Sequence, residues 1–309
     1  MLASIIVPAH DAATTLPRTL AGLAAQEVDG EFEVIVVDDG SSDRTGALAE
    51  EAGVHVVRHE RPLGPGASRN AGVAAAGSGV LAFTDADCAP TPRWLAAGLA
   101  ALGDSGLVQG RVEPRPDVPC GPYDKTLWVT SAWGLFESAN LFVRREVFES
   151  VGGFDDGLLE LAGAHFGEDV VFGWRARRAG VATGFSEEAL VHHEVFPRSA
   201  AEFVRERRRN ALFAALVREV PELREAFFYR RWFLSERSAR FALAAAGALA
   251  GAATRRPAIA AAAALPYAQI VRRELRGYGP RGAVARIAAD GVGFAALVRG
   301  SVRARRIVL

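Results

Sequence analysis

The sequence has few cysteines, few lysines and no leader-like segment. Of its 36 basic residues only Lys125 is a lysine, and it contains 2 cysteines. Two cysteines are too few for a disulfide framework, and Cys88 and Cys120 do not have the spacing of metal ligands. The first residues lack the basic region and the long apolar stretch of a signal peptide. We therefore expect a protein of the reducing cytoplasm.

Net charge is also absent, but the two ends of the chain differ strongly in charge. Residues 1–200 carry 28 acidic and 15 basic side chains, whereas residues 201–309 carry 8 acidic and 21 basic ones. Half of all residues are hydrophobic and 23% are charged, which is typical of a folded protein. The asymmetry indicates two parts with different partners.

Short apolar segments alternate with helical patterns over the first 110 residues. Uninterrupted β-branched runs are typical of strands that are buried on both faces of a parallel sheet. The alternation predicts right-handed crossovers and an open, mostly parallel α/β sheet, whose ligands bind beyond the carboxyl ends of the strands. The predicted strands are 4–7, 33–37, 55–57, 80–84, 107–112 and 139–143, and the predicted helices are 16–23, 45–52, 67–76, 170–179 and 202–216.

Paired aspartates follow two of the predicted strands. Asp38 and Asp39 end the second strand before a turn on Gly40, where carboxylates can accept hydrogen bonds from a nucleobase or ribose. Helix capping explains a neighbouring Ser or Asp, but the mutual repulsion of a tandem pair needs an outside partner. Asp85 and Asp87 end the fourth strand and can share one divalent cation, Mg²⁺ or Mn²⁺, which bridges a diphosphate.

A glycine-containing segment over residues 64–72 separates these two pairs. Its glycines allow close backbone approach, and Arg69 can reach a phosphate oxygen. The start of an ordinary helix with a surface arginine explains the same residues equally well.

Together, the segments 4–11, 36–43, 68–70 and 85–87 closely resemble glycosyltransferase family 2 in sequence and order. The resemblance covers residues 3 to about 193. It implies the GT-A fold, which is a Rossmann-like α/β fold. It also implies transfer of a sugar from a nucleotide-sugar donor with inversion of anomeric configuration.

The resemblance assigns roles on the donor side. It places Pro8, Ala9 and His10 at the nucleobase pocket and Asp39 on the base, commonly uracil, which favours a UDP-sugar. His10 takes a position where an aromatic ring often stacks on the base, although a loop histidine without a role is the alternative. The donor-side set is therefore Pro8, Ala9, His10, Asp38, Asp39, Arg69 and Asp85, with Asp85 and Asp87 as ligands of the Mn²⁺ or Mg²⁺ ion.

Three later segments, 138–145, 151–155 and 167–170, follow the family's order on the acceptor side. Inverting transfer needs a base that deprotonates the acceptor hydroxyl, and the resemblance places it at Asp169, with Glu168 as the alternative. Both carboxylates also suit the positive end of the following helix. His192 and His193 follow a short apolar segment, and the resemblance implies that one of them reaches the metal or the diphosphate.

The last third combines basic and apolar segments. The runs 241–254 and 258–271 are uncharged and separated only by Arg255, Arg256 and Pro257. Each is shorter than the about 20 residues of a transmembrane helix, and a single joined span would bury both arginines. We expect residues 238–273 to contact the inner surface of the cell membrane, which would suit a lipid-linked acceptor. Packing on the catalytic domain or on a partner, and true spanning, are the alternatives.

We expect a GT-A catalytic domain over 1–200, with donor binding in 1–110 and the acceptor side in 111–200, followed by a helical extension over 201–309. A nicotinamide-dependent oxidoreductase is excluded because residues 8–13 lack the glycines that admit a pyrophosphate. A sugar-nucleotide pyrophosphorylase needs a glycine-rich loop with an Arg or Lys directly after the first strand, and this sequence has none there. A non-catalytic nucleotide-sugar-binding scaffold would not need the carboxylates at 168–169. Nucleic acid is not expected, because the basic tail is strongly apolar.

Overall fold

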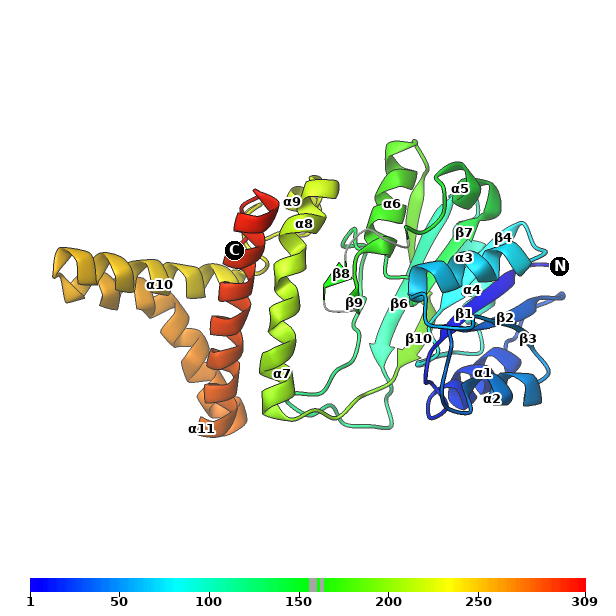
Figure 1. Cartoon of the computed structure of the whole chain (residues 1–309), viewed down its shortest axis with the longest axis horizontal. Helices are drawn as coiled ribbons and strands as arrows, with labels where there is room; N and C mark the ends of the chain where they lie inside the picture. The colour runs from blue at the N-terminus through cyan, green and yellow to red at the C-terminus, as the bar shows by residue number, and fades with distance from the viewer. Residues whose placement is uncertain (156–159, 162–163) are drawn as a thin grey trace. The chain divides into compact units, whose positions relative to one another are not determined.

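The computed structural model describes residues 1–155, 160–161 and 164–309. The chain forms two compact units (Figure 1). One contains Met1–Cys120 and Thr126–Phe196, and the other contains Gly121–Lys125 and Pro197–Leu309. The division therefore falls at residue 196 rather than 200, and a short internal segment belongs to the second, helical unit.

A mixed sheet with helices on its faces forms the centre of the first, catalytic unit (Figure 1). Its strands are β1 (Ser4–Ala9), β2 (Glu33–Asp38), β3 (His55–Arg58), β4 (Val80–Thr84), β5 (Cys88–Pro90), β6 (Leu107–Pro114), β7 (Asn140–Arg144) and β10 (Thr183–His193). They follow the order β3-β2-β1-β4-β7-β6-β10-β5. A separate pair is formed by β8 (Glu160–Leu161) and β9 (Ala164–His165).

The sheet is less parallel than the sequence pattern indicates. The strands β3, β2, β1 and β4 are parallel, as expected, and β10 is parallel to β6. However, β7 runs antiparallel to both β4 and β6, and β5 runs antiparallel to β10. No crossover helix joins β6 to β7 or β4 to β5, so the rule that makes consecutive strands parallel does not apply there.

Two helix starts place site residues. The helices of the catalytic unit are α1 (Leu16–Ala24), α2 (Thr45–Glu51), α3 (Pro65–Ala75), α4 (Trp94–Leu102), α5 (Arg145–Ser150) and α6 (Glu168–Arg178). Helix α3 begins earlier than expected, at Pro65, because proline fits the first helical turn. Gly167 precedes α6 with a positive φ of 84°, a conformation that favours glycine. Glu168 and Asp169 therefore occupy the first turn of α6 rather than the loop before it.

The core of the catalytic unit lies along the central strands. Ile5, Ile6 and Val7 in β1 have no exposed surface, which requires cover on both faces of the sheet. One polar residue is built into this core. Asn140 in β7 accepts a hydrogen bond from the Trp94 indole at 2.8 Å and donates to the carbonyls of β6 and β10, so it connects three strands of the sheet.

The helical unit contains the remaining helices. They are α7 (Ala200–Glu206), the 3₁₀ turn Arg207–Ala211, α8 (Leu212–Glu219), α9 (Leu223–Ala226), α10 (Glu236–Thr254) and α11 (Pro257–Ala304). The single helix expected over 202–216 is thus interrupted where arginines crowd at helical spacing and repel each other. Gly279, with φ 69° and ψ −179°, divides α11 into two helical segments.

Helix α10 and the first segment of α11 form a hairpin with a seam of small residues. A Cβ on Gly247 would lie 2.1 Å from Ala263 Cβ, and one on Gly251 would lie 3.0 Å from Ala260 Cβ. The two glycines are four residues apart, a spacing that lets apolar helices approach closely. Among the described residues, no helix combines the length and the apolar character that crossing a membrane requires.

Candidate active site

The loops after β1 and β2 are hydrogen-bonded to each other. The Asp39 backbone N–H donates to the Ala9 carbonyl at 2.8 Å, and His10 Nδ1 lies 2.9 Å from the Asp39 carbonyl oxygen. The His10 side chain remains 46% exposed. Pro8, Ala9, His10 and Asp39 therefore lie together at one edge of the sheet, where a ligand can reach the imidazole.

The Asp39 carboxylate is enclosed by donors. It is 5% exposed and accepts hydrogen bonds from His59 Nδ1 at 2.7 Å, from the Leu63 N–H at 2.9 Å and from the Gly64 N–H at 2.8 Å. Burial acts to raise the pKa of Asp39, but the hydrogen bonds from His59 and the two backbone groups outweigh it and lower that pKa. Asp39 thus fixes the loop that leads into α3.

Asp38 is directed away from this loop. Its Oδ1 accepts a hydrogen bond from the Ser41 N–H at 3.0 Å, which closes the turn after β2. Its Oδ2 lies 3.9 Å from Arg58 Nε and faces Gly46, where an added Cβ would come within 2.3 Å. The structure therefore separates the tandem pair, with Asp38 closing the turn after β2 and Asp39 holding the loop before α3.

Arg69 lies at the centre of the site, with 4% of its side chain exposed. One terminal nitrogen donates to Asp85 Oδ1 at 2.7 Å and the other to Glu168 Oε1 at 3.2 Å. Burial acts to lower the pKa of the guanidinium, but Asp85 and Glu168 outweigh it and raise that pKa. Arg69, which the sequence predicts to reach a phosphate oxygen, is paired with two carboxylates and so joins the motif after β4 to the motif that starts α6.

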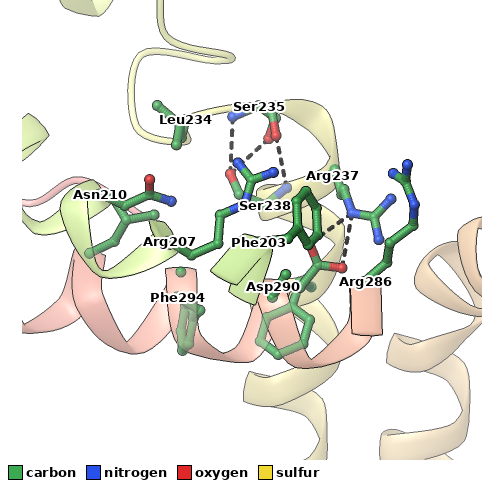
Figure 2. A pocket seen from close by; sticks show the side chains of 14 residues that line it. Phe203, Arg207, Asn210, Leu234, Ser235, Arg237, Ser238, Arg286, Asp290 and Phe294 are labelled. Carbon is green, nitrogen blue, oxygen red and sulfur yellow. Dashed lines mark hydrogen bonds and ion pairs between the residues drawn. The ribbon is translucent and has the colours of Figure 1, made fainter. Parts of the chain in front are cut away.

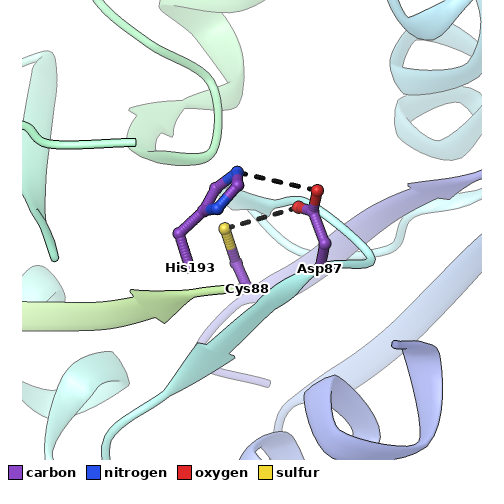
Figure 3. A group of neighbouring side chains, drawn as sticks. All are labelled: Asp87, Cys88 and His193. Atoms are coloured by element: carbon purple, nitrogen blue, oxygen red, sulfur yellow. Dashed lines mark hydrogen bonds and ion pairs between the residues drawn. The ribbon is translucent and has the colours of Figure 1, made fainter. Parts of the chain in front are cut away.

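Asp87 and His193 face each other beside Cys88 (Figure 3). His193 Nε2 lies 3.6 Å from Asp87 Oδ2, and Cys88 Sγ lies 3.8 Å from Asp87 Oδ1. Burial raises the pKa of the Cys88 thiol well above its ordinary value, and Asp87 adds to the effect, so the sulfur stays protonated unless a metal ion displaces the proton. The remaining carboxylate and imidazole suit Mn²⁺ better than Mg²⁺.

The two consecutive histidines lie in different surroundings, because side chains alternate between the faces of a strand. His193 is 7% exposed, and its Nδ1 lies 2.6 Å from the Glu194 carbonyl, so Nε2 is directed toward Asp87. His192 Nδ1 is buried without a hydrogen-bond partner, and burial lowers the pKa of this imidazole. The geometry brings His193, and not His192, to the carboxylate after β4.

Asp169 is a carboxyl group in acidic surroundings. Its Oδ1 accepts a hydrogen bond from the Val170 N–H at 2.8 Å, and the Ser138 N–H lies 3.4 Å from Oδ2. Burial raises the pKa of Asp169 well above its ordinary value, Glu168 and Glu137 raise it further, and Arg69 opposes them. A carboxylate with a raised pKa is a stronger base near neutral pH than an exposed aspartate.

Three polar residues of the site were not expected from the sequence. Burial raises the pKa of Glu137, which accepts a hydrogen bond from Gln109. Its negative charge also helps to raise the pKa of Asp169. His59 could have been found, because it follows β3 at the same sheet edge as Asp39. No sequence signal marks Gln109 or Glu137, since β6 and the loop before β7 meet only through antiparallel pairing.

The sequence matches two described families. Residues 4–148 match Glycosyl transferase family 2, and residues 132–271 match Glycosyl transferase family group 2. Glycosyltransferase AglE of Haloferax volcanii is 30% identical over 210 residues, which cover 63% of this chain and 67% of that protein. The Pre-mycofactocin glycosyltransferase of Mycobacterium tuberculosis is 30% identical over 213 residues, and the chain spans only 42% of that relative.

Solved structures agree on the fold. The mannosyltransferase PcManGT from Pyrobaculum calidifontis, in complex with GDP-Man and Mn²⁺, has a TM-score of 0.58 and 20% identity, covering 94% of this chain and 86% of that one. TarS of S. aureus in complex with UDP-GlcNAc has a TM-score of 0.52 and 18% identity, covering 99% and 93%. These likenesses establish the GT-A fold. The fold, the family match and the relative matched over two thirds of its length show that this chain belongs to glycosyltransferase family 2.

Proposed function

We propose that the protein transfers a sugar from a nucleotide-sugar donor to an acceptor hydroxyl, with inversion at the anomeric carbon. One observation carries the proposal: Arg69 holds Asp85 of the donor-side motif and Glu168 of the acceptor-side motif in one hydrogen-bonded network. Strand-end carboxylates of this kind suit the hydroxyls of a ribose and, through a bound cation, a diphosphate, and Asp169 lies next to Glu168. The acceptor hydroxyl and the donor phosphates would therefore meet beside a single guanidinium.

A UDP-sugar is the favoured donor, with the base beside His10 and Asp39. The exposed His10 ring can stack on a flat base, and the Asp39 loop supplies backbone groups at the same edge. The TarS structure holds UDP-GlcNAc, but the PcManGT structure holds GDP-Man. The likeness in fold therefore supports nucleotide sugars as a class, and the preference for uridine is an inference from the family resemblance.

A divalent cation, Mn²⁺ in preference to Mg²⁺, would be held by Asp87 and His193, whereas Asp85, which the sequence also predicts as a ligand, is hydrogen-bonded to Arg69. The mannosyltransferase from Pyrobaculum calidifontis was solved with Mn²⁺, and the facing carboxylate and imidazole here suit that ion. When bound, the cation supplies charge neutralisation for the departing diphosphate. Cys88 supports the site as a buried thiol that packs behind Asp87.

Asp169 would act as the general base. As the acceptor oxygen bonds to the anomeric carbon, its proton moves to an Asp169 carboxylate oxygen, and the bond to the diphosphate breaks with its electron pair on the leaving group. Attack opposite the leaving group inverts the configuration. Glu168 is less suited to this role because its carboxylate is already hydrogen-bonded to Arg69.

The decisive experiment is a donor screen with Mn²⁺ or Mg²⁺ that measures the nucleoside diphosphate released from each nucleotide sugar. At least one donor should be consumed, and Asp87→Ala should abolish metal-dependent donor binding in calorimetry. Asp104→Ala, which removes an exposed carboxylate of the same unit, is the matched control and should change neither quantity. Release from no donor at all, with the protein folded, would contradict the proposal.

Residues 238–273 would hold the protein at a membrane surface, which makes a lipid-linked acceptor and a location at the inner face of the cell membrane part of the proposal. Leu249 and Leu265 of the α10–α11 hairpin are 74% and 64% exposed, and Arg255 and Arg256 at its tip can pair with lipid phosphates. Leu249→Asp/Leu265→Asp should lose flotation with anionic vesicles, whereas Ile307→Asp should retain it. Equal flotation of both variants would refute this part.

A further inference from the structure

The helical unit contains two cavities with different chemistry. The first is lined in part by Arg207, Arg237 and Asp290 (Figure 2). Arg237 Nε donates to both Asp290 oxygens at 2.7 and 2.9 Å, and another of its nitrogens donates to Glu274 at 2.6 Å. The charge of Arg237 is therefore neutralised by Asp290 and Glu274. These ion pairs connect α10 to both segments of α11.

The second cavity is a groove between α7, the following 3₁₀ turn and the segment of α11 after Gly279. It is wide open to solvent, and its empty space, counted with the solvent at its mouth, is about 930 Å³. Its lining is apolar apart from three arginines, and no carboxylate takes part in it. The lining consists of Ala200, Ala201, Val204, Val284, Ala285 and Val292, with Arg205, Arg208 and Arg281.

The three arginines of the groove are almost unpaired. The Arg205 guanidinium lies 4.0 Å from Glu202 on the same helix, and both side chains are exposed, so this ion pair contributes little. Arg208 and Arg281 are exposed and form no ion pair or hydrogen bond with any residue that the structure describes. Guanidinium groups bind phosphate oxygens with paired, charge-assisted hydrogen bonds, so the groove offers anion-binding capacity that the protein itself does not use.

The apolar wall of the groove is exposed as well. Val284 is 66% exposed, and it lines the concave surface of the groove. A free phosphate would satisfy the arginines and leave this wall in contact with water, whereas a hydrocarbon chain without a charge would leave the arginines unused. A ligand that carries both groups would bury the apolar wall and pair the arginines at the same time.

We propose that this groove binds the phosphate group of a lipid, with Arg208 and Arg281 on the phosphate and the alkyl or isoprenoid chain against Val204, Val284 and Val292. Its use as the anchor of a lipid-linked acceptor rests on the transferase function proposed above. Binding itself does not, because all the groove residues belong to the helical unit and none belongs to the donor site.

The test is calorimetric titration of the protein, residues 1–309, with octyl phosphate, octanol and inorganic phosphate, each below its aggregation limit. Octyl phosphate should bind about tenfold or more tightly than either of the other probes, since only it makes both kinds of contact. Arg208→Glu/Arg281→Glu should weaken octyl phosphate binding about tenfold or more. Arg218→Glu/Arg303→Glu, which changes the net charge equally outside the groove, should leave the affinity within about twofold.

Two results would overturn the proposal. Equal loss of affinity in both double variants would mean that octyl phosphate senses only overall charge, and equal affinity for octanol would mean that the arginines do not take part. If the charge-reversed variant fails to fold, Arg208→Gln/Arg281→Gln keeps the test decisive. Nucleoside diphosphate release is measured separately on the same protein, so failure of transfer and failure of lipid-phosphate binding are distinguished.

Discussion

The catalytic unit and the groove of the helical unit treat charge in opposite ways. In the catalytic unit, the buried guanidinium of Arg69 meets two carboxylates, and the buried carboxylate of Asp39 meets three donors. In the groove, Arg208 and Arg281 keep their charges exposed and form no ion pair within the described part of the chain. Desolvation explains the contrast, because a charge that leaves water needs a partner in the fold and one that stays in water does not.

The largest effect on stability is expected from removing Arg69, the buried and paired arginine of the catalytic unit. Arg69→Met leaves Asp85 and Glu168 without their shared partner, and we expect a loss of about 3–5 kcal/mol in the free energy of unfolding. Chemical denaturation at pH 7 measures the change. The matched control is Arg44→Met. The Arg44 side chain is 69% exposed and pairs with the exposed Glu51, so this variant should stay within about 0.5 kcal/mol. Similar losses in both variants would show that burial of the arginine does not decide how much its ion pairs contribute to the free energy of unfolding.

Asp169 tests the same comparison with a partly buried carboxyl group, whose surroundings raise its pKa and so disfavour its ionised form. Asp169→Asn should lower nucleoside diphosphate release about 100-fold while sparing donor binding. The raised pKa makes Asp169 ionisation cost stability as pH rises from about 3.9 through the folded-state value. Asp169→Asn should therefore be more stable than the unmodified protein at pH 7. Full activity in this variant would remove Asp169 from the reaction.

Asp39 gives the opposite dependence on pH. Its lowered pKa means that its stabilising effect is complete above the ordinary aspartate value of about 3.9 and is lost as pH falls through the folded-state value. We expect Asp39→Asn to cost about 2 kcal/mol of unfolding free energy at pH 7. Denaturation curves between neutral and acidic pH should show the difference shrinking toward low pH, and a constant difference would contradict the assignment.

The smallest effect on stability is expected from substitutions of the groove arginines. Arg208→Gln removes a charge without a partner, so thermal unfolding should place its stability within about 0.5 kcal/mol of the unmodified protein. Arg205→Gln, which gives up only the distant Glu202, should behave alike. A loss of several kcal/mol would mean that the groove arginines support the fold and would count against a ligand-binding role.

Much of the donor half could be predicted from the sequence, because its elements are local. The β-branched runs gave the parallel strands β1 to β4, and the strand ends placed Asp39 and Asp85 at one edge of the sheet. The role of Arg69 could not be predicted in this way. Its partners Asp85 and Glu168 lie far apart in sequence and meet only after the sheet has formed.

The antiparallel half was harder to predict for a physical reason. Strand β7 follows a long irregular stretch, and no periodic pattern encodes that it pairs with both β4 and β6. The choice between His192 and His193 likewise depends on which face of β10 meets the β4–β5 turn, and this register is set by tertiary packing. Adjacent residues look equivalent in sequence, but a one-residue step reverses the face.

The two cysteines differ in a way that makes the protein convenient to label. Cys88 is buried and its thiol pKa is raised, whereas Cys120 is exposed. A maleimide dye at neutral pH should therefore react with Cys120 and leave Cys88 unmodified. Cys120 is the last residue of the catalytic unit before Gly121–Lys125 joins the helical unit. One fluorophore at that position would report on the junction as donor or lipid is added, without any engineered cysteine.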